Sequence, residues 1–97
     1  MFRIQVYGKD DCAKCSSTKQ KLSHLLAKWQ VAGEVELGWF DMATEDGMTE
    51  GAFNDVGEIP TTLLVDETGA EVGRWEAQIP PSDAVRQLLA DAGVVQA

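Results

Sequence analysis

Cys12 and Cys15 are the only cysteines in the chain, and they stand three residues apart where an apolar, strand-like run gives way to a long amphipathic pattern. A helix start leaves N–H groups without intrahelical partners and carries the positive end of the helix dipole, so a thiolate is stabilised there. Side chains three residues apart lie on one helical face, which lets the two sulfurs bond to each other. One sulfur can then attack a disulfide and the other can resolve the mixed disulfide. The spacing predicts a dithiol redox centre.

The charges around the cysteines act in opposite directions. Lys14 favours the Cys12 thiolate, whereas Asp10 and Asp11 disfavour it through like-charge repulsion. We therefore expect the pKa of Cys12 to be only moderately lowered. A strong oxidant needs a strongly stabilised reduced form, so these charges predict a reducing protein.

Length and composition limit the class of protein. A chain of 97 residues with 44% hydrophobic residues suits one domain over residues 1–97. A net charge of −8 argues against non-specific nucleic-acid binding. The chain opens on a strand-like run and has no stretch near the roughly 20 apolar residues that a membrane span needs. We therefore predict a cytoplasmic protein with no membrane partner, in which a lone CxxC is catalytic or metal-binding.

Hydrophobic periodicity predicts a β-α-β-α-β-β-α order. We expect strands over residues 2–7, 35–40, 61–65 and 70–75, and helices from Cys12 to a left-handed stop at Gly33, over 44–57, and from Pro80 to Gly93. Leu22, Leu25, Leu26 and Trp29 form the apolar stripe of the first helix, and Met48, Ala52, Phe53 and Val56 that of the second. The β-α-β unit favours parallel pairing, while Asp66-Glu67-Thr68-Gly69 predicts an antiparallel hairpin. The expected fold class is α/β, a four-stranded mixed sheet with helices on both faces.

Three segments together resemble the thioredoxin fold across almost the whole chain. Residues 6–15, which end in the CxxC, resemble the first strand and active site of glutaredoxins and small glutaredoxin-like redoxins. Ile59-Pro60-Thr61-Thr62 resembles the loop that carries a cis-proline in this superfamily. Residues 69–75 resemble the thioredoxin hairpin, in which a glycine lies near the active site. The chain is similar to a small atypical thioredoxin.

The resemblance implies a role for each of these residues. Cys12 would be the exposed attacking thiolate and Cys15 the buried resolving one, with a redox-active disulfide in place of any bound cofactor. Ile59 and a cis Pro60 would pair with an extended substrate segment, with Gly73 beside them. Substrates would be protein disulfides, and a flavoprotein reductase drawing on NADPH would recycle what we expect to be a monomer. No acidic residue can be placed as the buried proton acceptor of thioredoxins.

The sequence also departs from both families. Thioredoxins usually have Trp before the first cysteine and Gly-Pro between the two, where this chain has Asp11 and Ala13-Lys14. Glutaredoxins usually have Gly-Gly-Asp before the last helix, and residues 77–83 contain no glycine, which disfavours glutathione dependence. Three alternatives stay open: a glutathione-linked glutaredoxin, a redox-gated binding protein, and a metal module that joins both cysteines to a third ligand such as Asp10, Asp11 or His24. For His24 an exposed helix position is the simpler reading.

Overall fold

The computed structural model describes residues 1–95 and has the predicted order of elements. Every strand boundary lies within one residue of its predicted position. The elements are β1 (Phe2–Gly8), α1 (Ala13–Lys28), β2 (Val35–Asp41), α2 (Glu45–Phe53), β3 (Thr61–Val65), β4 (Glu71–Glu76) and α3 (Ser82–Asp91).

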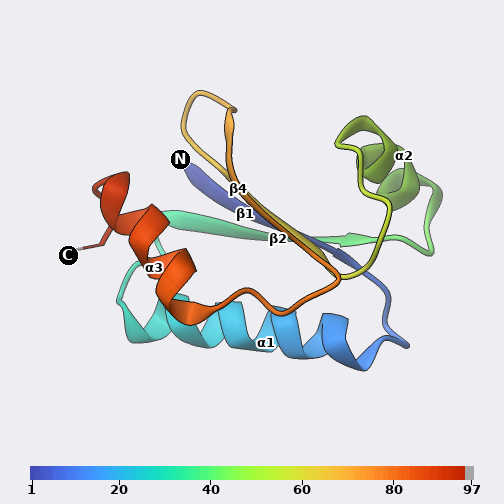
Figure 1. Ribbon diagram of the computed structural model, residues 1–97, viewed down its shortest axis with the longest axis horizontal. Helices are drawn as coiled ribbons and strands as arrows, with labels where there is room; N and C mark the ends of the chain where they lie inside the picture. Colours follow the sequence, from blue (N-terminus) through green and yellow to red (C-terminus); the bar gives the residue numbers. More distant parts are fainter. Residues whose placement is uncertain (96–97) are drawn as a thin grey trace.

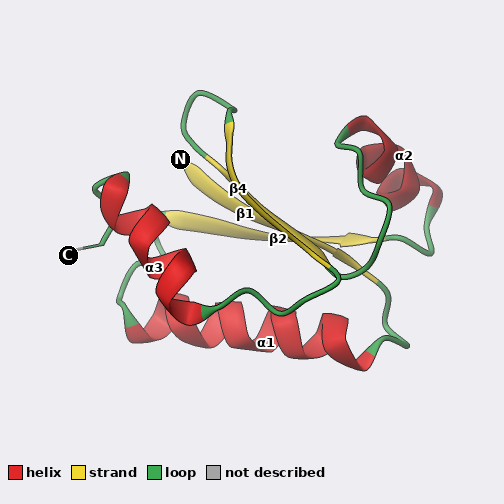
Figure 2. Ribbon diagram, viewed as in Figure 1, coloured by secondary structure: helices red, strands yellow, loops and turns green. Residues whose placement is uncertain are grey.

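The strands form one sheet (Figure 2), which is mixed and has the strand order β2-β1-β3-β4. β1 and β2 are parallel, because α1 returns the chain between them, and Gly8 lies opposite Asp41. β3 is antiparallel to β1 and to β4, with Thr61 paired to Tyr7 and to Glu76. The ends of β1, β2 and β4 and the start of β3 therefore meet at one end of the sheet. The loop that carries the cysteines follows β1 at this end.

Helices cover both faces of the sheet, as predicted: α1 and α3 lie on one face and α2 on the other (Figure 1). Because side chains alternate along a strand, even-numbered residues of β1 point to α1 and α3, and Tyr7 points to α2. The core against α1 and α3 contains Phe2, Ile4, Val6, Leu22, Leu26, Leu64, Val85 and Leu89. The smaller cluster beneath α2 contains Tyr7, Leu63 and Val65, with Phe40, Met42 and Val56 packed against it.

The first helix buries its predicted stripe but ends earlier than predicted. Leu22, Leu25 and Leu26 are buried and Trp29 is half-buried. The left-handed residue after α1 is Gln30, with φ 60°, so the predicted stop at Gly33 is wrong.

No helix within residues 1–95 is both long and apolar enough to cross a lipid bilayer.

The predicted apolar stripe of the second helix is wrong for Met48, Ala52 and Phe53, while Val56 packs beneath α2 but lies beyond the end of the helix. Met48 and Phe53 are 51% and 84% exposed, and the buried residues of α2 are Gly47 and Gly51. A Cβ on Gly51 would lie 2.7 Å from Cε of Met42, and one on Gly47 would collide with the Asp41 carbonyl. The two glycines therefore let α2 pack closely against the chain that leaves β2.

Candidate functional site

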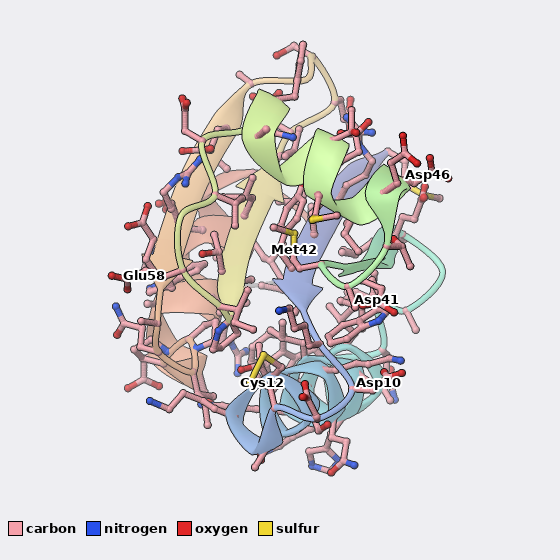
Figure 3. The ribbon with its side chains drawn as sticks, turned by 90° about the vertical axis from the view of Figure 1, so that its right-hand side faces the viewer. Asp10, Cys12, Asp41, Met42, Asp46 and Glu58 are labelled. Atoms are coloured by element: carbon pink, nitrogen blue, oxygen red, sulfur yellow. A yellow bond between two sulfur atoms is a disulfide. The ribbon has the colours of Figure 1, made fainter. Side chains whose placement is uncertain are left out.

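The loop after β1 delivers Cys12 to the start of α1, at the end of the sheet that faces the viewer in Figure 3. The Cys12 N–H donates to the Lys9 carbonyl at 3.2 Å, which closes a tight turn. Cys12 is the N-cap residue of α1 and forms a disulfide with Cys15 across a Cα–Cα distance of 5.2 Å. The predicted dithiol pair is therefore assembled at a helix start.

The two sulfurs have different surroundings. The Cys15 N–H donates to Cys12 Sγ at 3.1 Å, so the first sulfur takes up one of the free amide groups of the helix start. Cys12 is half-buried, whereas Cys15 is fully buried. A hydrogen bond from the backbone favours the charged form of a thiol, and burial disfavours it. Cys12 thus has the environment of a reactive thiolate, and Cys15 does not.

Gly8, the last residue of β1, leaves the space that Cys15 occupies. A Cβ at this position would lie 2.7 Å from Cβ and 2.8 Å from Sγ of Cys15. It would also lie 2.9 Å from the ring carbon Cη2 of Trp39, and the Lys19 ammonium lies 4.9 Å from the centre of that ring. Only a glycine lets the buried sulfur pack directly against the strand and Trp39.

The loop before β3 forms a second wall of the site. The Ile59–Pro60 peptide bond is cis, as the resemblance implies. Pro60 is buried, Ile59 is half-buried, and the Pro60 carbonyl accepts a hydrogen bond from the Ala77 N–H at 2.8 Å. Within the described residues nothing hydrogen-bonds to the backbone N–H or carbonyl of Ile59.

The rim of the site combines one engaged lysine with free carboxylates. Lys14 Nζ donates to the Ala77 carbonyl at 3.4 Å, which ties the first turn of α1 to the chain after β4. Asp10, Asp11 and Glu58 are exposed, and no residue of the described chain pairs with their side chains. Figure 3 shows Asp10 and Glu58 on opposite sides of Cys12. The structure therefore brings the predicted charges to the rim of the disulfide.

The structure does not bring Gly73 to the site. Gly73 pairs with Leu64 in the middle of β4, and a Cβ there would lie 2.6 Å from Cδ1 of Leu88. This glycine therefore makes room for α3. The residue beside Pro60 is Ala77, which has a left-handed φ of 56°. Ala77 could not be predicted from the sequence, because glycine is the residue type that indicates a left-handed conformation and alanine rarely adopts it.

A metal centre finds no support in the arrangement of side chains. Among residues 1–95, no group of three or more His, Cys, Asp or Glu side chains could hold a metal ion. His24 is exposed on α1. The third ligand that a module of this kind would need is not assembled beside the two sulfurs.

Solved structures of other proteins resemble this chain in fold, although their sequences share little identity with it. The sequence matches no protein-family model and no curated protein. Thioredoxin 1 from Thermosipho africanus matches the structure with a TM-score of 0.74 and 15% identity, over 95% of this chain and 96% of that one. Fasciola hepatica thioredoxin matches with a TM-score of 0.70 and 19% identity, over 93% and 79%. Oxidised mitochondrial thioredoxin 3 from Saccharomyces cerevisiae matches with a TM-score of 0.69 and 16% identity, over 93% and 77%.

The chain has the thioredoxin fold. Here the Cys12–Cys15 disulfide stands at the start of α1, the helix that follows β1, and the loop before β3 contains the cis Ile59–Pro60 bond. The fold and the disulfide together support a thiol–disulfide redox function.

Proposed function

We propose that this protein is a thiol–disulfide oxidoreductase that reduces protein disulfides. The observation that carries the proposal is the asymmetry of the pair: Cys12 Sγ accepts the Cys15 N–H at the helix start, while Cys15 is fully buried. The Cys12 thiolate attacks a substrate disulfide, forms a mixed disulfide and releases one substrate thiolate. The Cys15 thiolate then attacks Cys12 Sγ, which closes the Cys12–Cys15 bond and releases the second substrate thiolate.

The backbone of Ile59 supports a protein as the substrate. Its N–H and carbonyl have no hydrogen-bond partner in the described chain, and they lie beside the buried cis Pro60. An extended segment of a substrate can pair with such a backbone through main-chain hydrogen bonds. A segment docked there would present its disulfide to Cys12.

The proposed electron donor is a flavoprotein reductase that draws on NADPH. Each turnover leaves the Cys12–Cys15 disulfide, which needs two electrons and two protons to return to the dithiol. The chain after β4 has no glycine pair in the segment where glutaredoxins usually hold glutathione. This difference favours a reductase over glutathione as the source of electrons.

Turnover with a disulfide-bonded protein such as insulin tests the proposal. With dithiothreitol as reductant, we expect the wild type to accelerate insulin reduction and Cys12→Ser to be inactive. Reduced Cys15→Ser, mixed with insulin after the dithiothreitol has been removed, should accumulate a mixed disulfide. A parallel assay compares NADPH plus a thioredoxin reductase with glutathione plus glutathione reductase. Equal activity of wild type and Cys12→Ser would refute the proposal. Turnover in the glutathione assay but not in the thioredoxin reductase assay would show that glutathione, and not a flavoprotein reductase, supplies the electrons directly.

A further inference from the structure

The buried polar residues of the described chain are three threonines: Thr18, Thr61 and Thr62. No carboxylic acid within residues 1–95 is buried. The charged residues around the disulfide, on the loops, the strand ends and α1, are all exposed or half-buried: Lys9, Asp10, Asp11, Lys14, Lys19, Asp41, Glu58 and Glu76. Cys15 must nevertheless become a thiolate before it can attack Cys12, and burial disfavours that charge. The buried surroundings of Cys15 therefore need a hydrogen-bond donor.

Two of the three buried hydroxyls are already committed. Thr18 Oγ1 donates to the Lys14 carbonyl at 2.8 Å, and Thr61 Oγ1 donates to the Glu58 carbonyl at 2.6 Å. A hydroxyl carries one proton, so neither can donate a second hydrogen bond. Thr62 Oγ1 has no hydrogen-bond partner in the described chain. It is the uncommitted buried donor.

Sheet register places Thr62 on the same face as Cys15. Thr62 pairs with Val6, which belongs to the core against α1 and α3. Gly8 lies two residues beyond Val6 and points to the same face, where Cys15 packs against it. Thr62 and Gly8 are diagonal neighbours, which lie roughly 7–8 Å apart in an antiparallel pair, and Cys15 Sγ lies over Gly8, 2.8 Å from where a Cβ on Gly8 would be. Thr62 is therefore a buried residue on the same face as the sulfur, diagonal to the glycine against which that sulfur packs.

We propose that the Thr62 hydroxyl donates a hydrogen bond to the Cys15 thiolate while the Cys12–Cys15 bond is open. This inference rests on the proposed function. Cys15 gives its proton to solvent, and its thiolate attacks Cys12 Sγ. The new S–S bond forms as the mixed disulfide breaks, and the electron pair leaves with the substrate sulfur. Thr62 takes up no proton in this step, so it is a positioning residue that stabilises the charged sulfur.

Two-phase release of a chromophore tests this role. Reduced protein is mixed with dithiobis(nitrobenzoate), whose first thiolate is released by Cys12 and whose second is released when Cys15 closes the disulfide. Thr62→Val keeps the shape of the side chain and removes the hydroxyl. We expect the pH midpoint of the second phase to rise by about one unit and the first phase to stay unchanged.

The rate change depends on pH in a way that a packing defect would not reproduce. A one-unit rise in the pH midpoint of the second phase lowers the thiolate fraction of Cys15 about tenfold near neutral pH. A more basic thiolate is also a better nucleophile, which offsets part of this loss. The second phase of Thr62→Val should therefore be roughly threefold slower at pH 7, and no slower than wild type above both midpoints. Thr62→Ser should restore the wild-type profile. Thr18→Val is the matched control, because its hydroxyl is buried but committed.

The outcomes separate this inference from the proposed function. A wild type that releases no second thiolate would overturn both, since the dithiol would not close. A wild type with two phases, alongside a Thr62→Val protein with an unchanged midpoint, would overturn only the role of Thr62. A uniform slowing of both phases at every pH would also overturn it, since that is the effect of a disturbed fold.

Discussion

The buried hydroxyl groups on the two faces of the sheet at β1 differ in whether they have hydrogen-bond partners. On the α2 face, the Tyr7 hydroxyl accepts a hydrogen bond from Asn54 Nδ2 at 3.0 Å and donates to Gln5 Oε1 at 3.3 Å. The Tyr7 ring also stacks on Phe40, with ring centroids 4.7 Å apart. On the α1 face, one residue along the strand, Gly8 makes room for Cys15, and Thr62 keeps a buried hydroxyl without a partner in the described chain.

This difference separates a structural face from a reactive one. A buried hydroxyl without a partner costs about 1–3 kcal/mol, so proteins rarely keep one without a reason. On the α2 face the Tyr7 hydroxyl has hydrogen-bond partners, and these bonds contribute only to the stability of the fold. The α1 face holds the disulfide and keeps a donor free for the state in which that disulfide is open. Variants on the two faces should therefore change different properties.

Gly8→Ala should have the largest effect, because it fills the contact between strand and sulfur. The new Cβ would lie within 2.9 Å of Cys15 and Trp39, and overpacking of this kind costs about 1–3 kcal/mol. We expect urea unfolding to show that loss and thiol titration to show incomplete disulfide formation. Gly33→Ala is the control, because nothing lies within 4 Å of its Cβ, and it should change stability by less than about 0.5 kcal/mol. Equal effects would contradict the close packing of Cys15 on β1.

Tyr7→Phe should change stability alone. It removes a hydroxyl with two partners, while Asn54 keeps its hydrogen bond to the Glu50 carbonyl at 3.0 Å. We expect a loss of about 1 kcal/mol in urea unfolding and unchanged rates in both phases of the nitrobenzoate reaction. A changed second phase would mean that the α2 face also takes part in the redox step.

The same variant has a pH signature. Burial raises the pKa of the Tyr7 phenol above its usual range, and the hydrogen bond from Asn54 only partly offsets this. The resulting stability is fully present below the unfolded pKa of about 10 and is lost as pH rises through the folded pKa. The wild type should therefore lose its advantage over Tyr7→Phe in alkali, and a constant difference would count against a buried neutral phenol.

Lys14→Glu should have a smaller effect, confined to the rim. It reverses a charge in the first turn of α1 and removes the contact with the Ala77 carbonyl. We expect alkylation of reduced Cys12 at pH 7 to slow about threefold at low ionic strength and the difference to shrink with added salt. Lys9→Glu, in the exposed loop before the cysteines, is the control for charge alone. The same slowing in both variants would assign the effect to net charge.

Asp66→Asn should have the smallest effect, far from the site. Asp66 Oδ1 accepts hydrogen bonds from the Thr68 hydroxyl at 2.6 Å and from the Thr68 and Ala70 N–H groups. The Thr68 hydrogen bond first, and the backbone hydrogen bonds after it, lower the pKa of Asp66. Its stabilisation is present above the unfolded pKa of about 3.9 and is lost as pH falls through the folded pKa. The variant should be slightly less stable at pH 7 and equal to wild type in strong acid.

Patterns that depend on periodicity were predictable from the sequence, and close contacts were not. Alternation and helical spacing identify the strands and the stripe of α1, because each repeats along the chain. The spacing of Cys12 and Cys15 at a predicted helix start identifies the redox pair. The cis bond at Pro60 followed only from the resemblance. The buried residues of α2 are glycines, which no apolar stripe reveals, and the left-handed residues Gln30 and Ala77 are types that rarely adopt that conformation. The free hydroxyl of Thr62 depends on register between strands that sequence cannot supply.

The reduction potential of the Cys12–Cys15 pair tests the central claim most directly. Titration in dithiothreitol buffers, with free thiol as the readout and Cys15→Ser as the control, measures it. A reducing dithiol predicts one reversible two-electron step between roughly −200 and −290 mV, in the range of glutaredoxins and thioredoxins. A protein in which no intramolecular disulfide forms at any buffer ratio would contradict the redox function, and metal analysis of the purified protein would then test the remaining role of the two sulfurs.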